Sequence, residues 1–241
     1  MEVKVTTFNI QSCKDYVKKV FDPSVCSYAI IEINPEILGL NEVRGKGNDI
    51  YFTNQTRTIA NNTNFKYYIF GQAITVTDKG PYGNALLSKY PITNIEIIKI
   101  PDPLIKDEDA YYESRAIIKA NILVNGINLN VITTHVGLAR GEQKNAIKTL
   151  IDIIKPIIDK NEPLVLLGDF NMTPEDELID ELKQYVFDTT SLIDNSINTF
   201  PSINPIKKID YIFTKNVVVK KVHVEEIVAS DHFPLSAVIE L

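Results

Sequence analysis

The feature that most constrains this 241-residue chain is a series of short apolar runs, each bounded by turn-forming residues. The runs are rich in Val and Ile, and Gly, Pro, Asn or Asp stands between them, which is the pattern of β-strands joined by turns. The clearest hairpin surrounds Asn125-Gly126, because this dipeptide suits a type I′ turn. Strands are predicted at residues 3–10, 37–40, 65–70, 84–88, 95–100, 116–124, 127–134, 164–167, 209–213, 217–227 and 235–241.

Helical patterns are fewer. Residues 142–159 place apolar side chains at helix spacing, with Pro156 as a kink or a stop. A second helix is predicted over residues 15–33, broken near Pro23, and a short third helix is predicted to begin with Thr173 as its N-cap. Many strands with a few interspersed helices predict an α/β (α+β) fold of two sheets packed face to face with helices outside. The hairpin favours mainly antiparallel sheets, although the pattern alone does not separate this fold from a doubly wound sheet.

The chain is expected to form a single domain over residues 1–241, since its length suits one sizeable core and no linker-like or repetitive stretch interrupts it. The first residues alternate like a strand and do not resemble a signal peptide, and no apolar run is long enough to span a membrane. Cys13 and Cys26 are expected to be free thiols. These features predict a cytoplasmic protein, with a monomer as the default.

The formal net charge is −6, from 31 acidic and 25 basic residues. Duplex nucleic acids are bound mainly through Lys and Arg side chains that neutralise phosphates. The acidic balance therefore does not favour a nucleic-acid partner, although a local basic patch could outweigh it. Late in the chain several lysines cluster, and they are interpreted as solvated strand edges and turns. These are Lys207, Lys208, Lys215, Lys220 and Lys221.

Polar residues follow several predicted strands at the point where each apolar run ends. Ligand sites in sheet proteins form at such edges. The residues placed in this way are Asn9, Glu42, His135, Asp169, Asn171, Asp210, Asp231 and His232. Each short motif alone is typical of a turn or a cap, but the complete series indicates one site.

The residue types in this series suit hydrolysis of a phosphate ester assisted by Mg²⁺. Glu42 and Asn9 offer hard oxygen donors, and a magnesium site commonly takes one or two carboxylates. Asp169 could orient or deprotonate an attacking water, and His232 could pair with a carboxylate, for which Asp210 is the candidate. Histidines and amides near a scissile phosphate would stabilise the charge that develops on its oxygens.

The sequence resembles the endonuclease/exonuclease/phosphatase superfamily, which includes deoxyribonuclease I, apurinic endonucleases, inositol polyphosphate 5-phosphatases and neutral sphingomyelinases. The match runs in order along nearly the whole chain, and GDFN with a C-terminal SDHxP is its most specific part. It is carried by TFNI, LNEV, GNALLSKYPI, ESRAI, TTHVG, LLGDFNMTP, KKIDYIF and SDHFPLSAVI. The resemblance implies a four-layer αββα sandwich and a phosphoric ester hydrolase. It also implies Mg²⁺ as the cofactor, with Mn²⁺ able to substitute.

On the metal side, the resemblance implies that Glu42 ligates the cation, with Asn9 beside it and Asp231 close by. Gln11 stands where many members of the superfamily have an acidic residue, so a second metal contact is not expected there. Asn41 replaces the usual Gln before the metal-binding Glu. Little effect is expected from this change, because that side chain points away from the metal carboxylate in the superfamily.

On the phosphate side, the resemblance implies that Asp169 positions the nucleophilic water and that Asn171 contacts the phosphate. His232, supported by Asp210, would face the phosphate, either as base or as oxyanion stabiliser. His135 would donate to a phosphate oxygen. It stands where apurinic endonucleases have a Tyr, which favours the branch of phosphatases, sphingomyelinases and small bacterial hydrolases.

Residues 102–113 contain five acids against one Lys, and the resemblance places this stretch near the rim of the active site. An acidic rim repels a polyanionic duplex, although the stretch could equally be a solvated loop unrelated to substrate. Arg115, Asn84 and Tyr111 are candidate substrate or phosphate contacts, and a salt bridge to one of those acids is the alternative for Arg115.

The favoured hypothesis is a phosphodiesterase or phosphatase that uses metal-assisted in-line attack by water on a small or lipid-linked phosphate ester. A DNA or RNA nuclease, including one of the abasic-site repair type, is the alternative. A catalytically silent scaffold that binds phosphorylated ligands is the minor alternative. It is disfavoured because every residue of the motif series is present.

Overall fold

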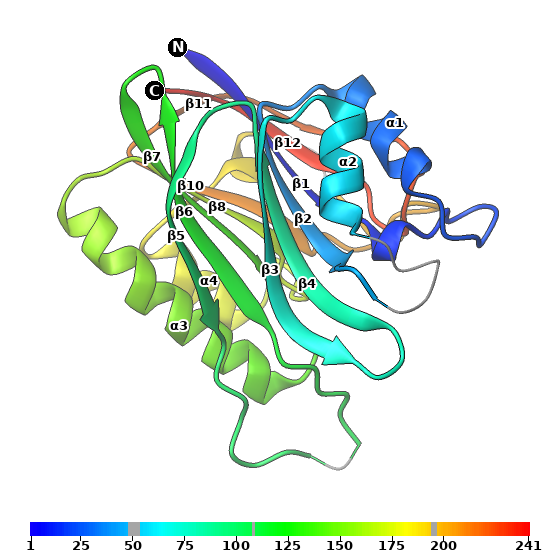
Figure 1. Ribbon diagram of the computed structural model, residues 1–241. Helices are drawn as coiled ribbons and strands as arrows, with labels where there is room; N and C mark the ends of the chain where they lie inside the picture. Colours follow the sequence, from blue (N-terminus) through cyan, green and yellow to red (C-terminus); the bar gives the residue numbers. More distant parts are fainter. Residues whose placement is uncertain (48–53, 108, 194–196) are drawn as a thin grey trace.

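A computed structural model describes residues 1–47, 54–107, 109–193 and 197–241. Two six-stranded sheets pack face to face, and two helices cover the outer face of each sheet (Figure 1). The predicted four-layer sandwich is thus confirmed. The helices are α1 (Pro23–Ile33) and α2 (Gln55–Thr63) on one side, and α3 (Arg140–Asp159) and α4 (Glu177–Lys183) on the other.

The first sheet has the strand order β11-β12-β1-β2-β4-β3. Its strands are β1 (Glu2–Asn9), β2 (Ile37–Arg44), β3 (Tyr67–Val76), β4 (Gly80–Ser88), β11 (Val218–Val224) and β12 (Leu235–Glu240). The second sheet has the order β5-β6-β7-β8-β10-β9. Its strands are β5 (Ile92–Lys99), β6 (Ala116–Val124), β7 (Ile127–His135), β8 (Leu164–Asp169), β9 (Phe187–Asp188) and β10 (Asp210–Lys215).

Both sheets are mixed, because each contains one parallel pair among its antiparallel pairs. The parallel pairs are β1 with β2 and β7 with β8. Parallel neighbours end at the same edge of a sheet, so each sheet brings two strand ends to one place. The β6–β7 hairpin turns at Asn125-Gly126 as predicted, and both residues have positive φ (47° and 91°), as a type I′ turn requires.

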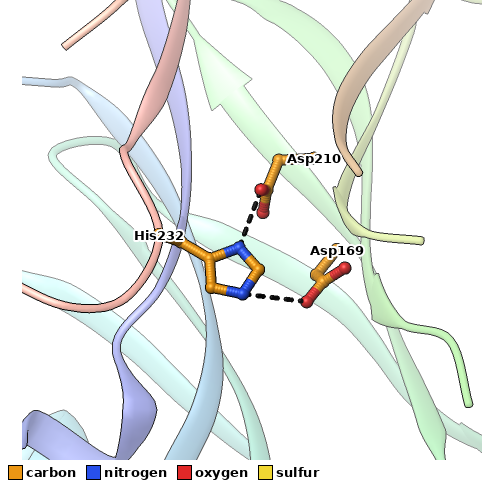
Figure 2. A group of neighbouring side chains, drawn as sticks. All are labelled: Asp169, Asp210 and His232. Carbon is orange, nitrogen blue, oxygen red and sulfur yellow. Dashed lines mark hydrogen bonds and ion pairs between the residues drawn. The ribbon is translucent and has the colours of Figure 1, made fainter. Parts of the chain in front are cut away.

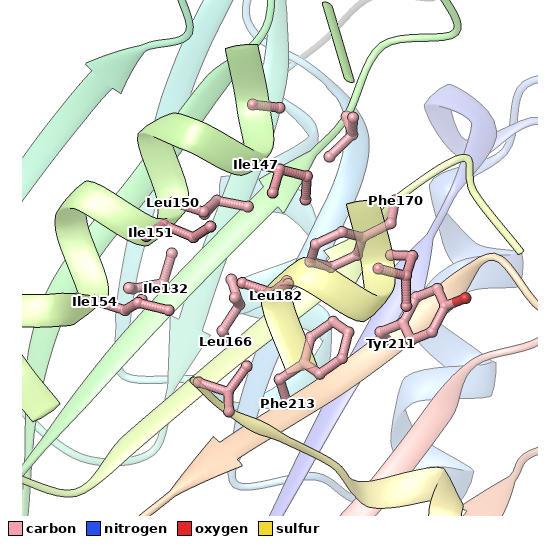
Figure 3. Close-up of a cluster of buried hydrophobic side chains, with 14 of the residues drawn as sticks. Ile132, Ile147, Leu150, Ile151, Ile154, Leu166, Phe170, Leu182, Tyr211 and Phe213 are labelled. Atoms are coloured by element: carbon pink, nitrogen blue, oxygen red, sulfur yellow. The ribbon is translucent and has the colours of Figure 1, made fainter. Parts of the chain in front are cut away.

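The hydrophobic core lies in three layers. The central layer joins the two sheets and includes Val5 of β1 and Leu167 of β8, which are fully buried. A second cluster packs α1 and α2 onto the first sheet. The third cluster packs α3 onto the second sheet, where Ile147 and Ile154 point toward strand residues such as Leu166 (Figure 3). Residues spaced three or four apart face the sheet in α3, which is the predicted helical periodicity.

Several predicted helix boundaries are wrong. The helix predicted over 15–33 begins only at Pro23, with Asp22 as N-cap, because proline suits the first helical position. Before it the chain forms a turn in which the Asp15 carboxylate accepts backbone N–H groups. Helix α3 continues through Pro156 and does not stop there.

The third helix begins later than predicted, because its N-cap is Asp176 and not Thr173. The Asp176 carboxylate accepts the Leu178 N–H at 2.9 Å. It also pairs with Arg140 at 2.8 Å, which ties the start of α4 to the start of α3. Helix α2 was not predicted, because its Asn- and Thr-rich sequence has weak helix propensity.

The lysines interpreted as solvated edges and turns fall into two groups. Lys220 and Lys221 are exposed or partly exposed on β11, which is an edge strand. The interpretation is wrong for Lys208, which is 7% exposed and pairs with buried Asp188 at 2.5 Å. Cys13 is free and buried, as is Cys26. No helix within the described residues is long and apolar enough to cross a membrane.

Candidate active site

Polar strand ends from both sheets meet at one edge of the sandwich. In the second sheet Asp169 ends β8 between two neighbours, since the register pairs it with His135 of β7 and with Asp210 of β10. In the first sheet Asn9 ends β1 opposite Asn41 of β2. The face-to-face packing then places the two sets next to each other, because Asn9 Nδ2 donates to Asp169 Oδ2 at 3.0 Å.

These strand ends form the floor of a hollow of about 490 Å³. It is lined by Glu42, Tyr82, Tyr111, Glu113, Arg115, His135, Leu138, Asp169, Asn171, Thr173, Phe200, Lys207, Ile209, Asp231 and His232. Of the predicted site residues, Asn9, Asp210 and Asn84 lie behind this surface and do not line it.

The close approach of β7 and β8 depends on Gly168. Its φ is +152°, and a Cβ atom at this position would lie 1.9 Å from the Thr134 carbonyl oxygen. Any side chain would therefore push β8 away from β7. The glycine of the GDFN motif thus keeps Asp169 beside His135.

Asp169 is 1% exposed and receives hydrogen bonds on both carboxylate oxygens. Oδ1 accepts the Asn171 N–H at 2.9 Å, and Oδ2 accepts from Asn9. Burial raises the pKa of Asp169 to about 7, and nearby Asp210 adds to this rise against the opposing effect of His232. The carboxylate therefore titrates close to neutral pH.

His232 lies between two carboxylates, as Figure 2 shows. Its Nδ1 is 2.8 Å from Asp210 Oδ2, and its Nε2 is 3.6 Å from Asp169 Oδ2. Burial alone would lower the pKa of His232, but Asp210 and Asp169 raise it to about 10. The ring also packs against Phe200, with centroids 4.9 Å apart. These contacts hold the His232 ring in one orientation, and the two carboxylates favour its protonated form.

His135, unlike His232, favours its neutral form. Burial lowers its pKa well below the usual value, and the positive charge of Arg115 adds to the effect. Arg115 Nη1 lies 2.9 Å from His135 Nδ1, and a guanidinium can only donate. Nε2 lies 3.5 Å from Asp169 Oδ2 and 3.1 Å from the Asn171 side-chain nitrogen, which is a donor as well. Both ring nitrogens therefore face donors, and a neutral ring accepts at only one of them.

Glu42 and Asp231 occupy the other wall of the hollow. Glu42 lies within an irregularity of the β2–β4 register, between Leu40 and Val43, and has a left-handed φ of 59°. Its Oε1 accepts from Asn9 Nδ2 at 3.2 Å. Asp231 Oδ2 accepts from Gln11 Nε2 at 2.7 Å, so Gln11, where the superfamily often has an acid, holds this carboxylate.

Asn41 is a site residue whose importance was missed. It is fully buried between the sheets. Its Nδ2 donates to the Thr134 carbonyl at 2.8 Å and to Asn84 Oδ1 at 3.0 Å, and its Oδ1 accepts the Asp169 N–H at 3.0 Å. Asn84 in turn donates to the Ala116 carbonyl at 2.8 Å. The sequence signal that could have identified Asn41 is an amide side chain at the end of an apolar strand.

The rim of the hollow carries Tyr111 and Glu113. Glu113 Oε1 pairs with Arg115 Nη1 at 2.8 Å, so the predicted alternative of a salt bridge to a nearby acid is present. Tyr111 is 61% exposed and its hydroxyl donates to Glu113 Oε2 at 3.0 Å. Within the acidic stretch 102–113, Glu108 lies outside the described residues.

Comparison with known proteins assigns the family. The sequence profile described as "Endonuclease/Exonuclease/phosphatase family" matches residues 6–232. The chain belongs to the endonuclease/exonuclease/phosphatase family. It is similar to the uncharacterized protein YbhP of Escherichia coli (strain K12), with 25% identity over 252 residues that cover 99% of this chain and 96% of YbhP.

Solved structures of the endonuclease/exonuclease/phosphatase fold are similar at lower identity. A family protein from Beutenbergia cavernae has a TM-score of 0.82 and 20% identity, covering 100% of this chain and 72% of that one. The mannosyl-6-phosphatase Bt3783 of Bacteroides thetaiotaomicron gives 0.79 and 17%, with 99% and 100% coverage. Truncated Caenorhabditis elegans TDP2 gives 0.75 and 16%, with 100% and 98% coverage. These likenesses establish the shared fold.

Members of the endonuclease/exonuclease/phosphatase family are hydrolases acting on phosphate esters and generally use divalent metals. Among the described residues, Asp169, Asp210 and His232 bring ligand atoms within 4.8 Å of one another and could hold a metal ion. Glu42 and Asp231 form a second, oxygen-based group. Burial raises the pKa of Glu42, and the charge of Asp231 adds to the rise although Asn9 opposes it. A cation between these carboxylates would relieve that cost, so the donor set fits a divalent metal.

Proposed function

We propose that this protein is a magnesium-dependent hydrolase of small phosphate esters. One observation carries the proposal. The Nε2 atoms of His135 and His232 converge on Asp169 Oδ2, at 3.5 and 3.6 Å, in a hollow whose other wall holds Glu42. A water-activating carboxylate, two ring donors and a metal carboxylate are the groups that attack of water on a phosphate ester needs.

In this proposal Asp169 orients the attacking water and takes its proton. A general base is most effective when its pKa lies near the working pH. The pKa of about 7 that burial gives Asp169 meets this condition. Its backbone N–H is held by Asn41 and its Oδ1 by the Asn171 N–H, so the carboxylate has one orientation.

The two histidines donate to phosphoryl oxygens. His232 is charged and hydrogen-bonded through Nδ1 to Asp210, so it acts as an oxyanion stabiliser and not as the base. His135 is neutral and lines the hollow, so with its hydrogen on Nε2 the ring can donate to a phosphate oxygen, which would replace the 3.1 Å contact between Nε2 and the Asn171 side-chain nitrogen. Arg115, which donates to Nδ1, is compatible with this tautomer.

Glu42 would hold the metal directly, with Asp231 close by and Asn9 orienting the Glu42 carboxylate. His232 is a poor ligand because its Nδ1 is engaged by Asp210 and its raised pKa keeps both nitrogens protonated. When bound, Mg²⁺ would polarise a phosphoryl oxygen and neutralise charge on the leaving group. Mn²⁺ is expected to substitute for it.

A small substrate is favoured over a nucleic acid. The net charge is −6 and Glu113 stands at the rim of the hollow, which disfavours a long polyanion. A structural neighbour named as a mannosyl-6-phosphatase supports a small phosphate ester. The free thiols Cys13 and Cys26 support a cytoplasmic location, and a monomer remains our default.

The test is hydrolysis of p-nitrophenyl phosphate and bis-p-nitrophenyl phosphate with Mg²⁺, with Mn²⁺ and with EDTA. We expect metal-dependent turnover that is lost in Glu42→Gln, Asp169→Asn and His232→Gln but kept in Asp152→Asn, which alters an exposed carboxylate of α3. Full activity in EDTA, or in Asp169→Asn, would overturn the mechanism. Cleavage of abasic DNA or short RNA with a steep salt dependence, and no turnover of small esters, would establish the nuclease alternative.

A further inference from the structure

A second hollow adjoins the candidate active site. It has a volume of about 350 Å³ and lies between residues 173–175, the end of α4 at Lys183, the short 3-10 helix η2 (Thr189–Leu192) and the segment 197–208. Thr173 and Lys207 line both hollows, so the two lie side by side at these residues. A ligand that passes these two side chains would therefore occupy both hollows.

Segment 199–208 holds this junction rigidly. Phe200 and Lys207 form a two-way backbone bridge, with N–H···O distances of 3.0 and 2.8 Å. On one side of the bridge Phe200 packs against His232. On the other, Lys207 reaches the surface between the hollows, and no ion pair to it exists within the described residues.

The charges in the second hollow leave an excess of positive charge. Its lining has three lysines, Lys183, Lys207 and Lys208, against two carboxylates. Asp188 is already neutralised, because it is buried and paired with Lys208 at 2.5 Å. Glu175 is fully exposed at the mouth, so water screens its charge.

Lys183 and Lys207 thus have the least compensated charges. The only ion pair of Lys183 among the described residues is with Asp180 at 3.3 Å, and the Asp180 side chain is 66% exposed. Such exposed pairs contribute little and exchange readily. The Ser191 hydroxyl supplies a neutral donor beside the same space, whereas the Thr173 side chain is hydrogen-bonded to Glu175.

We propose that the second hollow binds a second phosphate, or an equivalent anionic group, of the same substrate whose scissile phosphate occupies the catalytic hollow. The substrate class is then a small metabolite with two anionic groups. A concave surface with lysine ammonium groups and hydroxyl donors is suited to bind a phosphate, because each ammonium is a compact positive charge that attracts the phosphate oxygens. This inference rests on the proposed function only for the identity of the first phosphate.

The first measurement needs no catalysis. Inorganic phosphate is titrated into ¹⁵N-labelled protein without added metal, and the amide signals of Thr190 and Ser191 are followed. We expect saturable shifts, with the dissociation constant weakened about tenfold in Lys183→Met or Lys207→Met, since each removes one charge-assisted contact. Lys221→Met, on the exposed edge of β11, should leave the titration unchanged. The absence of saturable shifts at Thr190 and Ser191 would overturn the proposal.

The second measurement separates a second group of one substrate from a free anion. Calorimetry compares adenosine 5′-monophosphate with adenosine 3′,5′-bisphosphate, and fructose 6-phosphate with fructose 1,6-bisphosphate. We expect at least one bisphosphate to bind about tenfold more tightly than the corresponding monophosphate. This difference in affinity should disappear in Lys207→Met. Equal affinities in both pairs would overturn the proposal, even if inorganic phosphate binds. Failure of the wild type to hydrolyse any ester would count against the proposed function alone, because neither measurement depends on turnover.

Discussion

Asn41 offers the sharpest test of how the fold positions the active site. Its amide is fully buried between the two sheets and makes three contacts, two of which cross to the second sheet, at Thr134 and Asp169, while the third is to Asn84 in its own sheet. Replacing Asn41 by Ala would leave three buried groups without partners, namely the Thr134 carbonyl, Asn84 Oδ1 and the Asp169 N–H.

The magnitude follows from these three groups. An unpaired buried donor or acceptor costs about 1–3 kcal/mol. Because an alanine leaves room in which a water could satisfy some of the three groups, we expect the lower half of their summed cost, about 3–6 kcal/mol of lost unfolding free energy. Against a total stability of roughly 5–15 kcal/mol for a domain, this loss is large and readily measured by urea unfolding.

Activity should fall as well, because Asn41 holds the backbone of Asp169. Misplacing a reacting group by about one ångström can cost roughly 10²-fold in rate. We expect Asn41→Ala to lower kcat by this order with little change in KM. Asn41→Gln restores the residue usual in the superfamily, so it should recover more activity than alanine does.

Asn128→Ala is the matched control, because Asn128 lies exposed on β7. It should change the unfolding free energy by no more than about 0.5 kcal/mol. If Asn41→Ala is as stable as this control, the inter-sheet amide contributes no net stability and the reasoning fails. If it loses stability but keeps full kcat, Asn41 does not position Asp169.

Three further predictions concern single interactions. Although burial opposes it, pairing raises the pKa of His232 to about 10, so its stabilisation is complete below the usual histidine pKa and is lost as pH rises through about 10. Asp210→Asn should move that loss to lower pH in urea unfolding and reduce kcat roughly 10²–10³-fold; an unchanged pH profile would refute the pairing. Glu42→Gln should abolish the rise in melting temperature that Mg²⁺ gives the wild type, and a rise equal to that of the wild type would exclude Glu42 as a ligand. Lys208→Met leaves Asp188 buried without its partner and should cost about 3–5 kcal/mol of unfolding free energy, whereas Lys220→Met should be nearly neutral.

The fold could be predicted from the sequence because its signals are local. Apolar runs separated by turn residues marked the strands, and the Asn125-Gly126 turn marked a hairpin that the structure contains. The start of α4 could not be predicted, since the choice of Asp176 over Thr173 is reinforced by a salt bridge from Arg140 in another helix. Burial of Lys208 likewise depends on Asp188, which is distant in sequence.

The candidate site was predictable as a set of residue types but not as a network. Strand ends pointed to Asp169 and His232, and the structure brings them within 3.6 Å. Nothing local revealed that Arg115 contacts His135, or that Phe200 packs on His232. These contacts arise where loops meet strand ends, and loop conformation is the part of a fold that sequence patterns specify least.

The position of β1 in its sheet affects how the chain folds during synthesis. This strand lies between β2 and β12, and the register pairs Glu2 with Glu240. Asn9, which donates to both Glu42 and Asp169, is therefore synthesised well before β12, although β12 is the antiparallel neighbour of its strand. Asp231 and His232 also follow every other residue of the candidate site in chain order. A nascent chain consequently exposes an unpaired edge of β1 until β12 has emerged, and the candidate site is assembled only after His232 has been added.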